Sequence, residues 1–131
     1  MAYLGAVLRW DLFWADLDPA VGSEQAGERR PVVVLSNDGV NASLDVVTVL
    51  PVTKREGKRR KVYPFEVVLP AGTFTAAHES IVMPQQIRTI SKRRLLEKIG
   101  RLSDPGHQAE IENRVLEHLG IQFEAEGLDE F

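Results

Sequence analysis

The chain has 131 residues, of which 44% are hydrophobic and 27% are charged, and its formal net charge is −3. This length suffices for one domain with a real core, and the composition is that of a globular protein rather than a disordered one. The absence of cysteine excludes disulfides and thiol chemistry, and no apolar run approaches the ~18 residues of a membrane span. The N-terminus lacks the pattern of a signal peptide, so we expect a cytoplasmic protein.

The charges are distributed unevenly along the chain. Residues 1–103 hold 15 lysines and arginines against 11 acids, whereas residues 104–131 hold one arginine against eight acids. The basic residues gather at 29–30, 54–61 and 87–94. The first hundred residues therefore form a moderately basic body that could bind nucleic acid, despite the negative total.

The first half of the chain predicts three strands. Residues 11–19 are rich in β-forming residues and end at an Asp-Pro turn signal. The apolar run 32–36 is typical of a strand buried on both faces, 37–43 predicts a loop, and 44–52 predicts the next strand.

The second half predicts two more strands and two helices. Pro64 in the segment 62–69 indicates an edge strand, a bulge or a delayed strand start. One more strand over 80–90 runs into a polar segment, and Ser91 is expected to cap a short helix with Leu95, Leu96 and Ile99 turned inward. Apolar residues at helical spacing predict a final helix between Ser103 and Gly120.

The order of these elements predicts the fold class. Four or five short strands followed by one clear helix indicate a mainly β protein with a small antiparallel sheet or barrel. Since there is no repeat and no linker, we expect a single domain over 1–120 and an acidic tail over 121–131.

The polar segment 22–30, GSEQAGERR, stands directly before the buried strand. Arg30 at the base of that strand offers a rigid fork of donors suited to phosphate oxygens. Ser23, Glu24 and Gln25 supply a hydroxyl, a carboxylate and an amide, which can hydrogen-bond the base edges of single-stranded RNA. Thr53 would add a hydroxyl if its strand pairs with the 32–36 strand. A turn stabilised by an Arg–Glu pair is the alternative interpretation.

Metal and nucleophile chemistry find little support in the sequence. Asp16 and Asp18 would share a strand face and could hold a hard cation, but too few further oxygen ligands accompany them. The three histidines stand at no ligand spacing, and neither a nucleophile elbow nor a phosphate loop is present. We expect no metal and no cofactor.

Further blocks of sequence follow the polar segment in a definite order. DLFWADLDPAV and GSEQAGERRPVVVLSND precede VLPVT (49–53), YPFEVVL (63–69), QIRTI (86–90) and LLEKIGRLS (95–103). Together they resemble the MazF/PemK family of toxin endoribonucleases from bacterial toxin–antitoxin pairs, over nearly the whole chain.

The resemblance implies a fold, a reaction and partners. The fold would be a small SH3-like antiparallel β-barrel, of the MazF and CcdB type, with a short helix and a C-terminal helix, assembled as a homodimer. The reaction would be a metal-independent, sequence-specific cleavage of single-stranded RNA, in which the ribose 2′-OH attacks the adjacent phosphate and leaves a 2′,3′-cyclic phosphate and a 5′-OH. A cognate antitoxin would bind the same groove through an acidic tail.

The resemblance also implies residue roles. The catalytic residues would be Arg30 and Thr53. Glu24 is the nearest carboxylate that could serve as the 2′-OH base, with a solvent molecule as the alternative. The residues expected to contact RNA are Ser23, Gln25, Lys54, Arg60, Gln86 and Arg88.

The chain departs from the family pattern in three places. Trp10 stands where glycine is usual, so we expect the loop before the first strand to run differently. Gln85 replaces a common acid, which removes a charge near Arg88, and the segment 54–61 is unusually basic. Trp10 and Gln85 leave one alternative open, a nuclease-dead RNA-binding module. A second alternative is a protein-binding toxin on the same scaffold, like the gyrase poison CcdB.

Overall fold

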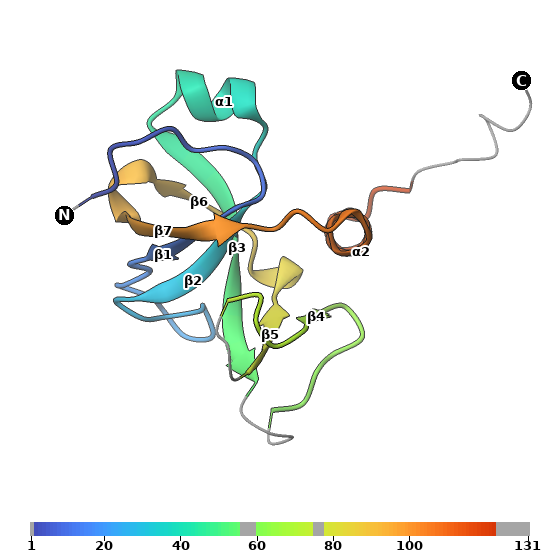
Figure 1. Cartoon of the computed structure of the whole chain (residues 1–131). Coiled ribbons are helices and arrows are strands. Elements are labelled where there is room, and N and C mark those ends of the chain that lie inside the picture. The colour runs from blue at the N-terminus through green and yellow to red at the C-terminus, as the bar shows by residue number, and fades with distance from the viewer. Residues whose placement is uncertain (1, 56–59, 75–77, 123–131) are drawn as a thin grey trace, which may run out of the picture.

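Seven strands form one antiparallel sheet, and a C-terminal helix packs beside it (Figure 1). The computed structural model describes residues 2–55, 60–74 and 78–122. In chain order the elements are β1 (Asp11–Ala15), β2 (Arg30–Val34), α1 (Asp38–Ser43), β3 (Val46–Arg55), β4 (Val67–Leu69), β5 (Glu79–Val82), the 3₁₀ turn η1 (Pro84–Gln86), β6 (Arg88–Ser91), the 3₁₀ turn η2 (Lys92–Arg94), β7 (Leu95–Arg101) and α2 (Pro105–His118). No helix within these ranges is long and apolar enough to cross a membrane.

The long strand β3 organises the sheet. The strand order is β4-β5-β3-β2-β1-β7, with β6 also paired to β3. One edge of β3 pairs with β2, whereas the other edge pairs with β6 along its first half and with β5 along its second half. Within the described ranges no pairing joins β7 to β4, so the predicted antiparallel β fold is confirmed as a sheet that does not close into a full barrel.

Both faces of the sheet are buried. On one face, here called the α2 face, Leu12, Val33 and Leu50 form a core with residues of α2. On the other, here called the Phe13 face, Phe13 packs with alternate residues of β2 and β3, and Tyr3 meets its ring edge-on at 4.8 Å. Burial on both sides explains why the strands read as continuous apolar runs.

Of three features predicted between residues 37 and 69, two differ from the structure and one is confirmed. The segment 37–43 was expected as a loop, but it contains α1. Asn37 caps the N-terminus of this helix by accepting a hydrogen bond from the Val40 N–H. The strand predicted over 44–52 extends to Arg55, because it pairs with β5 beyond residue 52. The delayed start that Pro64 suggested is confirmed, since β4 begins only at Val67.

The helix predicted after Ser91 is wrong. Ser91 caps only the turn η2, and Leu95–Arg101 is strand β7, paired with β1. The register shifts twice along this pair, which leaves Leu96 and Ile99 as extra residues of β7. These bulges break the strict alternation of a strand, so the apolar residues at 95, 96 and 99 imitate helical spacing.

The final helix is confirmed with adjusted ends. Asp104, rather than Ser103, is the N-cap and accepts a hydrogen bond from the Gly106 N–H, with Pro105 as the first helical residue. At the other end Gly120 has φ 70°, and the Ile121 N–H bonds to the Leu116 carbonyl, which closes the helix.

Trp10 adopts a left-handed backbone conformation, which usually favours glycine. Its φ is 73°, and its side chain is 6% exposed in the core of the α2 face. The Arg9 guanidinium lies 4.9 Å above the ring, and the Trp10 N–H and C=O bond to Val34 and Leu102. Burial of the indole thus offsets a backbone conformation that disfavours side chains.

This balance predicts an inverted order of stability at position 10. Trp10→Gly should destabilise the fold by about 2–4 kcal/mol, because it removes a buried indole but relieves the backbone strain. Trp10→Ala should be worse by about 1 kcal/mol, although alanine normally exceeds glycine in stability. Urea unfolding of both variants measures the difference, and an alanine variant at least as stable as the glycine variant would argue against a left-handed residue 10.

Candidate functional site

Arg30 and Thr53 lie at neighbouring ends of two adjacent strands. Their strands β2 and β3 are paired, which was the condition for the two residues to meet. The pairing runs from Val34–Val49 to Val32–Pro51, so Arg30 and Thr53 each lie two residues beyond its last pair, at neighbouring ends of the two strands. Both side chains belong to the Phe13 face, because Arg30 pairs with Ala15 on that face and side chains alternate along a strand. Thr53 is also paired with Ile81 of β5, so a strand flanks it on either side.

The Arg30 side chain is held against the loop that precedes its strand. Its Nε donates to the Ala26 carbonyl at 2.9 Å. Gly27 has φ 135°, and a Cβ placed on it would lie 2.5 Å from both Cγ and Nε of Arg30. Glycine is therefore required here twice, for its backbone conformation and for the space that the Arg30 stem fills.

Hydrogen bonds from three directions fasten the loop 22–29. The Asp18 Oδ1 accepts from the Gly27 N–H at 2.8 Å, and the Gly27 carbonyl accepts from the Leu17 N–H at 2.8 Å. The Gln86 amide uses both of its ends: its Nε2 donates to the Ser23 carbonyl at 3.0 Å, and its Oε1 accepts from the Gln25 N–H at 3.2 Å. The Arg94 guanidinium donates to the carbonyl oxygens of Asp16 and Asp18, which lie between β1 and this loop. Gln86, predicted to contact RNA, thus holds the loop itself.

Glu24 points back into its own loop. Its Oε1 accepts from the Val21 N–H at 3.3 Å, and the residue is exposed. Glu24 and Ser23 are both solvent-accessible on the loop beside Arg30. A turn stabilised by an Arg–Glu pair within the segment is not observed, because Arg29 pairs across the sheet with Glu97 of β7 at 3.0 Å.

A hollow of about 210 Å³ opens beside Arg30. Three cationic side chains line it together with two aromatic rings and two smaller residues: Arg29, Arg30, Lys54, Trp14, Phe74, Pro31 and Ser80. Cations with aromatic rings are the side chains that bind phosphates and stacked bases in single-stranded nucleic acids.

Arg88 adds a further cation to the Phe13 face. It pairs with Val49 at the start of β6, and its NH1 is buried without a hydrogen-bond partner among the described atoms. A buried guanidinium nitrogen without an acceptor is costly, which makes it a candidate for binding an anion. Arg88 thus lies beside the middle of β3, on the face to which Arg30 belongs.

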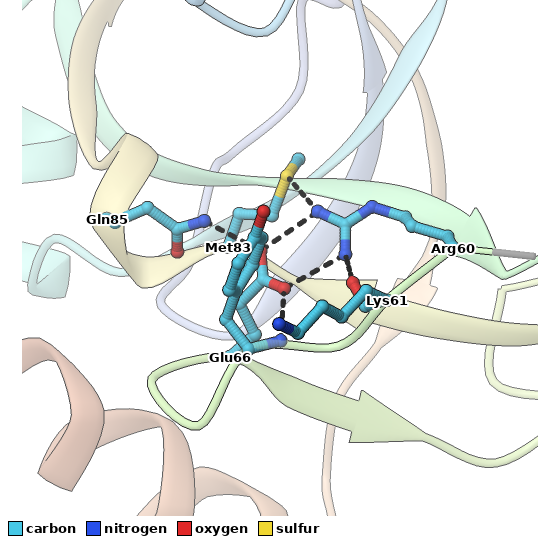
Figure 2. Close-up of polar contacts among 6 residues, drawn as sticks. Arg60, Lys61, Glu66, Met83 and Gln85 are labelled. Carbon is cyan, nitrogen blue, oxygen red and sulfur yellow. Dashed lines mark hydrogen bonds and ion pairs between the residues drawn. The ribbon is translucent and has the colours of Figure 1, made fainter.

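Arg60, also predicted to contact RNA, is bound to a buried acid instead. Its NH1 and NH2 donate to the two oxygens of Glu66 at 2.9 and 3.0 Å, and NH2 also lies 3.7 Å from the Met83 sulfur (Figure 2). Burial tends to raise the pKa of Glu66, but the hydrogen bonds from Arg60, Gln85 and the Tyr63 N–H hold it below its ordinary value. The carboxylate in turn raises the pKa of Arg60. The cluster was not predicted from the sequence, although Glu66, a lone acid in the apolar run FEVVL, indicates a buried charge that needs a partner.

Gln85 belongs to the same cluster. Its Nε2 donates to Glu66 at 2.6 Å, so its polar group faces Glu66 (Figure 2). No hydrogen bond between Gln85 and Arg88 is observed among the described residues. The expectation that this position bears on the charge near Arg88 finds no contact in support of it.

Asp16 and Asp18, whose carboxylates were considered as cation ligands, accept hydrogen bonds from backbone N–H groups. Asp16 accepts a hydrogen bond from the Asp18 N–H, and Asp18 accepts one from Gly27. In the ranges that the structure describes, no group of three potential metal ligands gathers at one place.

Comparison with known proteins assigns the family. The family model for the PemK-like, MazF-like toxin of type II toxin–antitoxin systems matches residues 8–119. A relative named endoribonuclease MazF9, from Mycobacterium tuberculosis, is 41% identical over 86% of this chain and 96% of its own. The chain therefore belongs to the MazF-like toxin family.

Solved structures agree with this assignment. MazF from Deinococcus radiodurans superposes with a TM-score of 0.74 at 30% identity, covering 89% of this chain and 99% of its own. A MazE–MazF structure from the same organism gives a TM-score of 0.67 at 26% identity, covering 90% and 99%. The predicted family and fold are thus confirmed.

Proposed function

We propose that this MazF-family endoribonuclease cleaves single-stranded RNA at specific sequences and without a metal ion. In this reaction the ribose 2′-OH attacks the adjacent phosphate, and the products carry a 2′,3′-cyclic phosphate and a 5′-OH. The observation that carries the proposal is that Arg30 and Thr53 belong to one face at the neighbouring ends of the paired strands β2 and β3, with the Arg30 stem held against Ala26 and Gly27. A fixed cation beside a hydroxyl is what a developing phosphorane requires.

Arg30 is the group that neutralises the transition state. A guanidinium keeps its proton in proteins, so Arg30 acts as a donor and not as a base. The Thr53 hydroxyl hydrogen-bonds and positions the reacting phosphate. Glu24 is the candidate base for the 2′-OH, since it is exposed on the adjacent loop, with solvent as the alternative.

The remaining polar groups divide between phosphates and bases. Lys54 and Arg88 bind backbone phosphates. Lys54 lines the hollow beside Arg30, and Arg88 presents a buried nitrogen without a hydrogen-bond partner in the described part of the chain. Ser23 and Gln25 on the exposed loop contact base edges and supply the sequence preference. Arg60 is left out of this set, because Glu66 occupies both of its terminal nitrogens.

An antitoxin and a second copy of the chain complete the proposal. A MazE–MazF structure is among those that this fold matches, which supports a cognate antitoxin for this protein. The cations that bind RNA phosphates would equally attract an acidic antitoxin segment. We also propose a homodimer, which sedimentation would detect as a particle of twice the 14.6 kDa chain mass.

The relatives' names favour the nuclease over its two rivals, the protein-binding toxin and the RNA-binding module. Incubation with single-stranded RNA in EDTA separates all three. Cleavage supports the nuclease, and binding without cleavage supports the module. The absence of both binding and cleavage supports the protein-binding toxin.

The reaction predicts a sharp dependence on one substrate atom. Cleavage should proceed unchanged in EDTA, and the products should carry cyclic phosphate ends by mass spectrometry. A substrate with a single 2′-deoxy sugar at the cut site should bind but resist cleavage, because the attacking oxygen is missing. The control carries the deoxy sugar two nucleotides away and should be cut normally. Efficient cleavage of the first substrate would refute the mechanism.

A further inference from the structure

Glu66 is a buried carboxylate at the centre of a hydrogen-bonded cluster. Its side chain is fully buried and accepts from Arg60 twice, from the Tyr63 N–H at 3.1 Å and from Gln85 at 2.6 Å. Arg60 is the charged group among these partners, and Tyr63 contributes its backbone N–H. Four donors on one carboxylate fix its position firmly.

Gln85 and Gln86 are neighbours in the turn η1, and their amides bond in two different directions. Gln85 donates to Glu66 in the segment between β3 and β4, whereas Gln86 binds the backbone of Ser23 and Gln25. The turn therefore bridges a rigid buried cluster and the loop that carries the exposed groups beside Arg30.

The orientation of the Gln85 amide depends on Glu66. Its Nε2 has the carboxylate as partner, while its Oε1 is buried without a hydrogen bond among the described atoms. Leaving a buried oxygen unpaired is unfavourable, so the bond to the charged partner must outweigh it. A carboxylate at position 85 would instead face Glu66 at hydrogen-bond distance and repel it.

We propose that Gln85 and Glu66 form a positioning pair that sets the loop 22–29 for cleavage. The pair fixes the position of η1, and Gln86 in that turn fixes the position of the loop through its two hydrogen bonds. Neither residue touches the reacting atoms. The effect on catalysis depends on the proposed RNA cleavage, whereas the mechanical link between the pair and the loop can be measured without it.

The first test follows the amide of Gln25, whose hydrogen bond to Gln86 reports on the link. In Gln85→Glu, hydrogen exchange at this amide should accelerate about tenfold at neutral pH. The Val40 amide, held by Asn37 in α1, is the internal control and should be unaffected. Lowering the pH to about 5 should reduce the difference from the native protein, because the new carboxyl has a raised pKa beside Glu66, so it regains its proton and donates again below that pKa.

The second test is a rescue. Glu66→Gln combined with Gln85→Glu exchanges the amide and the acid, and should return Gln25 exchange to within about threefold of the native value. In single-turnover cleavage, Gln85→Glu should lose about tenfold in rate with little change in RNA affinity, and the double variant should regain most of it. If Gln85→Glu does not fold, Gln85→Leu removes the amide without adding charge and should accelerate the same amide.

Two outcomes would overturn the proposal. Unchanged Gln25 exchange in the folded position-85 variants would show that the loop does not depend on the pair. Accelerated exchange that Glu66→Gln does not reverse would show that repulsion between the two acids is not the cause. A native protein that cuts no RNA would refute the proposed function alone, since the exchange measurements would still decide the link.

Discussion

Arg30→Ala should slow single-turnover RNA cleavage by at least about a hundredfold, the usual effect of removing one preorganised charge or donor at a transition state. The variant should still fold, because Arg30 is only half-buried and its Nε donates to a loop carbonyl. Arg30→Lys should recover only part of the rate, since an ammonium group lacks the planar fork that meets two phosphate oxygens.

Arg29 provides a matched control one residue away. It lines the same hollow, but Glu97 binds its guanidinium at 3.0 Å and the Trp14 ring lies beneath it at 5.0 Å. Arg29→Ala should therefore change the rate by less than about fivefold. Equal losses in the two variants would mean that general positive charge, and not the placement of Arg30, supports the reaction. A fully active Arg30→Ala would refute its catalytic role.

Gly27→Ala should also suppress cleavage, although residue 27 carries no reactive group. The added Cβ would overlap the Arg30 side chain at 2.5 Å, and the left-handed φ of 135° disfavours any side chain. We expect a loss of at least about tenfold in rate from displacement of the guanidinium, together with a loss of about 1–2 kcal/mol in the free energy of unfolding.

Gly72→Ala separates these two effects. Gly72 has φ 96° and open space around its Cα, so alanine there meets the backbone penalty alone. It should lower stability by a similar amount and leave the cleavage rate unchanged. Identical kinetics for both glycine variants would show that contact with Arg30 does not matter.

The pairing of the strands that carry Arg30 and Thr53 could be predicted because strand pairing is regular, whereas their catalytic role comes from the family resemblance and stays a prediction. Once 32–36 and 44–52 are read as neighbouring strands, Arg30 and Thr53 fall at their adjacent ends, and the pairing in the structure agrees. The irregular features were missed for the same physical reason. The bulges of β7 break the alternation on which a strand is recognised, and the left-handed Trp10 leaves no trace in composition.

Contacts between distant segments were also beyond the sequence. Arg60, Glu66 and Gln85 meet only because β3, β4 and η1 converge, and no spacing rule connects the three positions. Similarly, the demand for glycine at 27 arises from where the Arg30 stem lies and not from a turn motif alone.

The shared edge of β3 has a consequence for how such proteins can be re-engineered. Because β3 serves β2, β5 and β6 at once, a single inserted or deleted residue within it would turn Thr53 to the opposite side and disturb both halves of the sheet. The loop 22–29 and the turn η1 lie outside this strand. New target sequences are therefore best sought by exchanging the loop and the turn together as one cassette, with the strand left untouched as the fixed frame.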